Sequence, residues 1–332
     1  GVCVGRTSYQ YPPRIYQVPA GTLRAGENEI VIRLVSNAGC PEFVKGKPYQ
    51  LEIAGRTLPL AAIWKHKMGC TMERIPSTIG FQNEPTGLYN SMIHPLRNYG
   101  IRGIIWYQGE SDTGPQGSKL YESHLIDLIN DWRTQWNNKN LPFIIVQLAN
   151  YQQRSKVPVE SGNARVREAQ RKASLQLKNA GLATAIDLGE SNDIHPLNKK
   201  DLAHRCVLQM NKLAFGKKNI VAEGPMAESA ELKDGRIIVS FMQGTGTLKQ
   251  AESLEGIAVA ANDGKYKFVK AYTEGNTVIV KWDGKGIPVS IRYAWENNPP
   301  SSIYNTEGLP ASSFQLPVVS KVKYSVTVRT AL

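Results

Sequence analysis

Two short polar segments of this sequence carry side chains that could catalyse the hydrolysis of an ester or an amide. The first is SNDIHPLNKK, residues 191–200, in which His195 follows Asp193 by two positions and precedes Pro196. A carboxylate beside a histidine orients the imidazole and stabilises its charged form, as a general base requires. We therefore expect His195 to be a catalytic base oriented by Asp193. The alternative is a histidine near a helix start that makes one backbone hydrogen bond.

The second polar segment is IIWYQGESDTG, residues 104–114, which places an amide, a backbone N–H and a carboxylate together at Gln108, Gly109 and Glu110. A glutamine amide or a glycine N–H that points into a cleft can stabilise a developing oxyanion. The alternative is a polar turn in which glycine provides backbone freedom. Ser111 lies in the same loop, but the loop lacks the second glycine of a Gly-x-Ser-x-Gly elbow. The sequence therefore offers a base without an obvious nucleophile.

Both polar segments follow a predicted strand. Short apolar runs at residues 101–107, 141–148 and 182–188 are typical of strands buried on both faces. Apolar residues at helical spacing cover 120–136, 166–177 and 202–213. This alternation predicts a doubly wound parallel sheet, in which ligands bind beyond the carboxyl ends of the strands. Three strands make a thin sheet, so we expect further strands from outside this segment.

The regions on either side of this α/β part have the rhythm of short β-strands. RIYQVPAGTL (14–23) and NEIVIRLV (28–35) are apolar or alternating runs bounded by Gly, Pro and Asn, which favours a small β-sandwich. From about residue 220 the same rhythm returns in six runs, with DG and GN turn signals between most of them: GRIIVSF, LEGIAVAA, YKFVKAY, NTVIVKW, IPVSIRYAW and KYSVTVRT (323–330). We expect three domains: a β-sandwich at 1–75, an α/β domain at 76–218 and a second β-sandwich region at 219–332.

The composition of the 332-residue chain is that of a folded protein, with 41% hydrophobic and 20% charged residues. The net charge of +12 is spread along the chain without a basic stripe, so we expect no nucleic-acid partner. No apolar run approaches the ~20 residues that span a bilayer. The cysteines and histidines show no metal-ligand spacing. Cys206 lies on an apolar helix face, and a Cys3–Cys40 or Cys40–Cys70 disulfide would fit an exported protein.

Together these segments resemble the sialate O-acetylesterase family, a branch of the SGNH (GDSL-like) hydrolases. The matching segments are GLYNSMIHPL (87–96), IRGIIWYQGESD (101–112), VREAQ (166–170), NDIHPLNKKDLAHR (192–205) and IRYAWENNPPSSIYNTEGLPASSF (291–314). PPRIYQVPAGTLRAGENEIVIRL, near the start of the chain, also looks like the inserted β-domain of that family. The resemblance implies an SGNH-type three-layer α/β/α fold with an inserted, galactose-binding-like β-sandwich and an all-β region at the C-terminus.

The family implies an esterase that removes acetyl groups from sugar hydroxyls by a Ser-His-Asp mechanism, without a metal or cofactor. Its serine lies in a Gly-Gln-Ser-Asn block before the β insertion, and this sequence contains no such block. We therefore expect the serine upstream of Gly1 or on a companion segment. By resemblance, His195 is the base and Asp193 its orienting carboxylate. The superfamily spaces Asp and His three apart, and that position is Asn192 here, so Asp187 is the substitute.

By the same resemblance, Gln108 and Gly109 match the loop that supplies donors to the oxyanion hole, and Glu110 would buttress that loop or contact the sugar. Sialic acid is the substrate named by the family, but acetylated xylan-type or pectic sugars fit the residues equally. We expect a secreted or periplasmic protein, or a lysosomal-like one in a eukaryote. Two alternatives stay open: a non-catalytic carbohydrate-binding fragment, and an SGNH-type hydrolase that acts on lipid or peptide esters.

Overall fold

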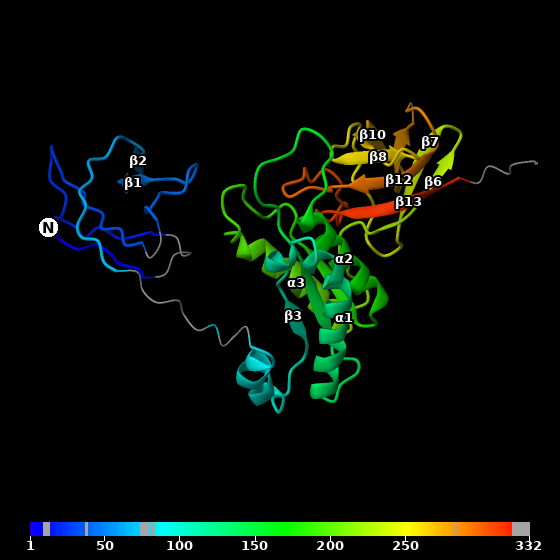
Figure 1. The fold of residues 1–332 in the computed structure, drawn as a ribbon, viewed down its shortest axis with the longest axis horizontal. Helices are drawn as coiled ribbons and strands as arrows, with labels where there is room; N and C mark the ends of the chain where they lie inside the picture. Colours follow the sequence, from blue (N-terminus) through cyan, green and yellow to red (C-terminus); the bar gives the residue numbers. More distant parts are fainter. Residues whose placement is uncertain (9–13, 37–38, 74–79, 81–83, 283, 321–332) are drawn as a thin grey trace, which may run out of the picture. The chain divides into compact units, whose positions relative to one another are not determined.

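The structure, a computed structural model, describes residues 1–8, 14–36, 39–73, 80, 84–282 and 284–320. Its contacts divide the chain into two units, Gly1–Leu88 and Tyr89–Leu332 (Figure 1). Across the described residues, no helix is both long enough and apolar enough to cross a membrane.

The described residues of the first unit contain one β-hairpin. Strand β1 (Gln50–Ile53) pairs antiparallel with β2 (Arg56–Pro59). Ala54 and Gly55 join them with φ angles of 47° and 77°. Two central residues with positive φ are typical of the tight turns whose twist matches that of the flanking strands. The sequence of this turn, Ala-Gly, therefore closes the hairpin.

The strands expected at residues 14–23 and 28–35 are absent from the described part of this unit. Ile15 and Val31 are 82% and 81% exposed there. A strand persists where a neighbour pairs with its backbone and covers its apolar side chains, and the described residues supply neither to these two segments. The domain boundaries expected for this region stay predictions.

The second unit begins with short helical turns and continues into a three-stranded parallel sheet. The turns before the first strand are η2 (Tyr89–Ile93) and η3 (His94–Leu96). The strands are β3 (Ile104–Trp106), β4 (Phe143–Gln147) and β5 (Ala180–Thr184), in the spatial order β3-β4-β5. β3 and β4 lie within their apolar runs, and β5 overlaps the run at 182–188 but begins two residues before it, so the prediction of three parallel strands is confirmed.

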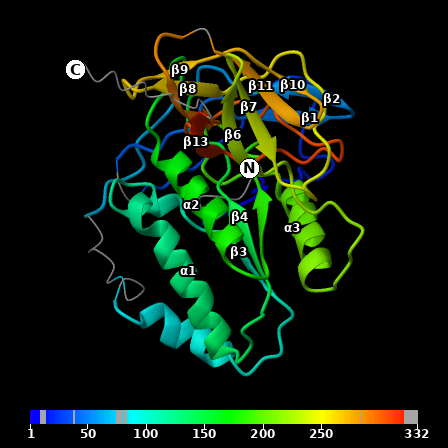
Figure 2. The same ribbon diagram turned by 90° about the vertical axis from the view of Figure 1, so that its right-hand side faces the viewer.

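Helices cover both faces of this sheet (Figure 2). They are α1 (Gly117–Gln135), α2 (Gly162–Gln176) and α3 (Lys199–Leu213), and the short turn η4 (Glu110–Asp112) precedes α1. Alternate side chains of β4 enter opposite cores, because successive residues of a strand point to opposite faces. Phe143 and Ile145 pack with α1 and α2, whereas Ile144 and Val146 pack with α3.

The C-terminal region is an eight-stranded mixed sheet with the order β10-β11-β7-β6-β13-β12-β8-β9. Its strands are β6 (Ala227–Lys233), β7 (Arg236–Phe241), β8 (Ile257–Ala261), β9 (Tyr266–Phe268), β10 (Ala271–Glu274), β11 (Thr277–Lys281), β12 (Pro288–Tyr293) and β13 (Phe314–Ser320). The neighbours are antiparallel except for β6 and β13. Val239, Val259, Val280 and Ile291, from both halves of the sheet, share one core, so the sheet curls around it (Figure 1).

Two of these strands, β6 and β13, were not predicted from the sequence, and the expected run YKFVKAY divides into β9 and β10. The strand expected at residues 323–330 lies outside the described residues.

Candidate active site

The two polar segments lie beyond the carboxyl ends of the parallel strands, where the fold brings them to one pocket. Its lining residues come from three strand-end loops and the start of α2: Glu110, Leu148, Ala149, Tyr151, Asn163 and Ile194. Glu110 belongs to the loop after β3, and Ile194 directly precedes His195 in the loop after β5. The segments that the sequence analysis singled out therefore share a surface, although more than one helix and strand separate them along the chain.

His195 lies at the exposed rim of this region, and Asp193 contacts it twice. The backbone N–H of His195 donates to Oδ1 of Asp193 at 2.9 Å, and Nδ1 of the ring lies 3.5 Å from the same oxygen. The imidazole is 47% exposed. A carboxylate beside Nδ1 of a histidine is the arrangement that a general base uses.

Asp187, the substitute for Asp193, has other partners. Its two carboxylate oxygens accept hydrogen bonds from the guanidinium of Arg205 at 2.6 and 2.9 Å. The hydroxyl of Tyr304 donates to the same carboxylate at 3.3 Å. Burial, with Asp187 nearby, raises the pKa of Tyr304, so this phenol stays a donor. Asp187 therefore fixes α3 and the C-terminal region to the end of β5.

The Gln108 side chain folds back onto its own loop. Its Nε2 donates to Oδ2 of Asp112 at 2.7 Å. The Tyr121 hydroxyl lies 3.0 Å from Oε1 of Gln108 and 2.7 Å from its backbone carbonyl. Burial raises the pKa of Tyr121 to about 12, which keeps this hydroxyl protonated. The Gln108 amide thus shapes the loop, and the backbone N–H of Gly109 makes no hydrogen bond to a described residue.

Gly109 occupies a conformation and a space that exclude other residues. It is buried, and its φ is 143°. A Cβ at this position would lie 2.9 Å from Cγ1 of Val166 and 3.1 Å from the hydroxyl oxygen of Tyr121. The backbone therefore passes directly against α2 and α1, and the polar loop is held close to the sheet.

Helix α2 braces the loops around the pocket with buried polar side chains. The Arg167 guanidinium is fully buried and donates to the backbone carbonyls of Leu148, Ala149, Glu296 and Asn297, at 2.7–3.1 Å. Burial lowers the pKa of Arg167 to about 9, so it is charged at neutral pH. Those four carbonyls belong to the loop after β4 and to the segment after β12. Arg167 therefore joins the α/β part to the C-terminal region.

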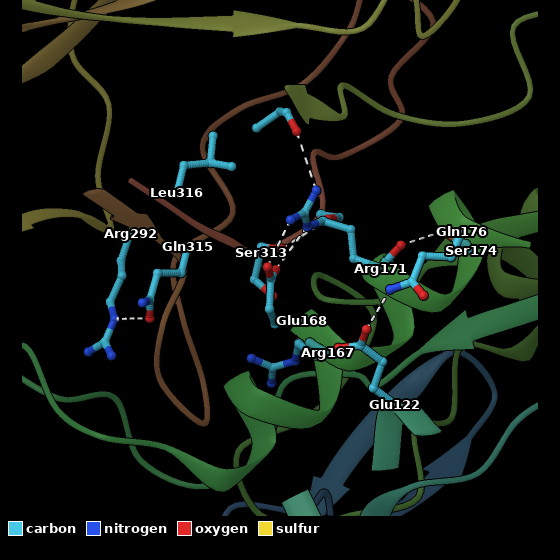
Figure 3. Close-up of polar contacts among 12 residues, drawn as sticks. Glu122, Arg167, Glu168, Arg171, Ser174, Gln176, Arg292, Ser313, Gln315 and Leu316 are labelled. Carbon is cyan, nitrogen blue, oxygen red and sulfur yellow. Dashed lines mark hydrogen bonds and ion pairs between the residues drawn. The ribbon is translucent and has the colours of Figure 1, made fainter. Parts of the chain in front are cut away.

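A buried ion pair on the next turn of α2 faces the C-terminal sheet (Figure 3). Arg171 binds both oxygens of Glu168 at 2.8 Å and donates to the carbonyl of Ala227 at 3.3 Å. Close by, Arg292 of β12 donates to Gln315 of β13 at 2.8 Å. Arg167, Glu168 and Gln170, the polar residues of the VREAQ segment, are all buried and act as braces.

Sequence reasoning missed Tyr107, Tyr151 and Asn163, which lie at the strand-end loops or line the pocket. Tyr107 follows β3, and no described residue bonds its buried hydroxyl. Burial raises the pKa of Tyr107 to about 12, so its hydroxyl is a neutral donor. No short motif marks these residues; the signal that could have found Tyr107 and Tyr151 is their place at the end of, or shortly after, a predicted strand.

The described part of the chain contains neither a cluster of metal-binding side chains nor a disulfide. It holds no group of three or more His, Cys, Asp or Glu residues that could bind a metal ion. All four cysteines are free thiols: Cys206 is buried, and Cys3, Cys40 and Cys70 are exposed.

Comparisons with known proteins agree on one family. The model of a family described as "carbohydrate esterase, sialic acid-specific acetylesterase" matches residues 72–205, which include both polar segments. The sialate O-acetylesterase of Pongo abelii is 30% identical over 235 residues, 64% of this chain and 44% of the relative. The human sialate O-acetylesterase is 28% identical over 278 residues, 76% of this chain and 51% of the relative.

A solved structure is similar in fold and in sequence. The crystal structure of a carbohydrate acetylesterase from Xanthomonas citri superposes with a TM-score of 0.64 and 35% identity. The match covers 69% of this chain and 53% of that one. The chain spans about half the length of the relatives it matches.

Proposed function

Because this chain belongs to the sialate O-acetylesterase family, we propose that it provides the general base and the oxyanion loop of an esterase that removes acetyl groups from sugar hydroxyls. The observation that carries this proposal is the pocket shared by Glu110 and Ile194, with the His195–Asp193 pair at its edge. The relatives and the structural neighbour are named as sialate or carbohydrate acetylesterases, which supports an acetylated sugar as the substrate class.

The proposed reaction has two halves. A serine hydroxyl attacks the acetyl carbonyl while Nε2 of His195 takes its proton, and Asp193 stabilises the imidazolium. The Gly109 N–H faces the developing oxyanion, which it stabilises by a hydrogen bond. The sugar alcohol leaves with the proton from His195, and an acetyl-enzyme remains. Water then attacks the acetyl-enzyme, again with His195 as the base, and acetate is released.

We propose that the serine comes from a segment that adds a strand beside β3. Two features support this placement. The chain contains no Gly-Gln-Ser-Asn block. Among the described residues no strand pairs with the outer side of β3, and Ile105 of β3 is 52% exposed, whereas every residue of β4 is buried. A parallel sheet is normally covered on both faces and extends until its apolar strands are buried.

The decisive experiment uses the complete polypeptide, with its serine-bearing segment. His195→Ala should lower the turnover of p-nitrophenyl acetate by about 10²–10⁴-fold, the usual contribution of a general base. His204→Ala, at an exposed histidine of α3, is the matched control and should leave turnover unchanged. Near-normal turnover by His195→Ala would rule out this mechanism.

A panel of esters tests the substrate class. O-acetylated sialic acid, acetylated xylan and acetylated pectin should be hydrolysed faster than esters with longer acyl chains, because the proposed pocket is small. Faster hydrolysis of the longer esters would instead favour a lipid or peptide esterase. Glycan binding without any hydrolysis by the complete polypeptide would favour a binding fragment.

A further inference from the structure

Two asparagines link the C-terminal region to the loop that carries His195. Asn150 follows β4, and Asn298 lies in the segment after β12, 148 residues away. Nδ2 of Asn150 donates to Oδ1 of Asn298 at 2.8 Å. Oδ1 of Asn150 accepts the backbone N–H of Gly189 at 2.7 Å. Gly189 lies in the loop after β5, between that strand and the Asp193–His195 pair.

The two hydrogen bonds select one orientation of the Asn150 amide. A rotated amide would direct its NH₂ group at the Gly189 N–H and its oxygen at the oxygen of Asn298, which are two repulsive contacts. Asn298 is itself oriented, because its Nδ2 donates to the carbonyl of Gln152 at 2.7 Å. Each asparagine therefore uses both ends of its amide. The hydrogen bonds from Asn298 to Asn150 and from Asn150 to Gly189 form a relay that connects the C-terminal region to the His195 loop.

The segment that contains Asn298 is firmly held. Arg167 donates to the carbonyls of Glu296 and Asn297 at 2.7 and 2.8 Å. Ser161 donates to Oδ1 of Asn297 at 2.6 Å, and the N–H of Tyr151 donates to the Asn297 carbonyl at 3.1 Å. A buried arginine and the N-cap residue of α2 thus fix the origin of the relay.

The His195 loop depends on such anchors, since the histidine itself is exposed. Glu190 forms isolated bridges with Tyr151 and with Asp193, next to the anchored Gly189. At the far end, Oδ1 of Asn198 accepts the N–H of Asp201 at 3.2 Å and caps α3. The hydrogen bond at Gly189, the bridges of Glu190 and the cap at Asn198 therefore all hold the loop on which Asp193 and His195 lie.

We propose that Asn298 and Asn150 are positioning residues for His195, through which the C-terminal sheet region controls the geometry of the catalytic base. This inference rests on the proposed function only in taking His195 as the base. Neither asparagine lines the pocket, so the relay acts on the loop and not on the substrate. Loss of either asparagine side chain removes a hydrogen bond of the relay. The loop then becomes less ordered, and the imidazole of His195 is less often in its catalytic position.

The test compares Asn298→Ala with the wild type in the complete esterase. Hydrogen–deuterium exchange at Gly189 and over residues 187–198 should be about tenfold faster in the variant, as the loss of an ordinary hydrogen bond predicts. The kcat for p-nitrophenyl acetate should fall about tenfold with KM unchanged, because substrate contacts are intact. Asn150→Ala should change the exchange rate and kcat at least as much as Asn298→Ala does. The double variant should change them no more than Asn150→Ala alone.

A second comparison separates positioning from general destabilisation. In a His195→Ala background, Asn298→Ala should cause no further loss of the residual rate, because its effect passes through the imidazole. Asn276→Ala is the matched control: its amide oxygen accepts the Leu248 N–H at 2.9 Å in the same C-terminal region. This control should change neither exchange over 187–198 nor kcat.

Three results for Asn298→Ala would overturn the inference. They are unchanged exchange at Gly189, faster exchange without a change in kcat, and a further loss of the residual rate in the His195→Ala background. Failure of the proposed function is a different result. It would appear in the wild type as the absence of esterase activity, while exchange at Gly189 would still report whether the relay exists.

Discussion

Nε2 of Gln170 donates a 3.0 Å hydrogen bond to the backbone carbonyl of Gln108. The same amide accepts the N–H of Leu148 through Oε1, also at 3.0 Å. One fully buried side chain on α2 thus ties the loop after β3 to the loop after β4, which are two of the three loops that form the pocket. A donor and an acceptor on one planar group set the spacing of these loops.

Gln170→Glu should separate the two functions of this amide. The carboxylate still accepts the Leu148 N–H, but it has no donor for the Gln108 carbonyl and places a charge in a buried site. We expect a loss of about 1–3 kcal/mol in the free energy of unfolding, or more if the charge is retained, together with a lower kcat. Urea unfolding and ester hydrolysis measure the two effects. Gln153→Glu, at an exposed glutamine, is the control, and equal effects of the two variants would refute this role.

Asp193 and Asp187 should respond differently when each is changed to asparagine. Asp193→Asn removes the charge that stabilises the imidazolium of His195, so kcat should fall by about two orders of magnitude or more with little change in stability. Asp187→Asn leaves the buried Arg205 without its anionic partner, so the melting temperature should fall while the kcat of the folded fraction changes less. The reverse pattern would make Asp187 the orienting carboxylate.

Gly109→Ala should strain the oxyanion loop. An alanine at a φ of 143° costs about 1–3 kcal/mol, and its Cβ would also press on Val166 and Tyr121. We expect lower stability and a loss of esterase activity greater than the loss of folded protein. Gly114→Ala, in the same loop, is the control, because a Cβ there meets no atom within 4 Å. Thermal unfolding and kcat/KM would show equal effects at the two glycines if the close approach at Gly109 were unimportant.

The sequence predicted the parallel sheet better than the C-terminal one. Strands β4 and β5 are almost entirely buried and β3 is partly covered, so all three have nearly continuous apolar runs, which are visible in the sequence without knowledge of the neighbouring strands. β6 has the sequence AESAELK, rich in residues with low strand propensity, and β13 contains Pro317, which argues against a central strand. Both strands form because their neighbours pair with them, and local sequence does not contain that information.

The candidate site divides in the same way. Polar residues directly after predicted strands pointed to the loops of Gly109 and His195, because the ends of parallel strands meet at one edge. The braces could not be predicted, since each joins residues far apart in sequence. Arg167 contacts a carbonyl 129 residues away, and Asp187 finds its partner Arg205 on the next helix. A polar residue on a helix does not reveal whether a distant segment will cover it.

Glu296 should make stability depend on pH. Burial raises the pKa of its carboxyl above the ordinary value, even though the Ser155 N–H donates to it at 2.6 Å. The folded protein therefore keeps this proton to a higher pH than the unfolded chain, and the stability linked to it is lost as pH rises through the folded pKa. Glu296→Gln does not ionise and retains an oxygen for Ser155. Relative to the wild type, its free energy of unfolding should increase from pH 4 to pH 8, as measured by urea unfolding. Glu255→Gln, at an exposed carboxyl, should show no such trend. The assignment would be contradicted if the free energy of unfolding of the wild type increased with pH relative to that of Glu296→Gln.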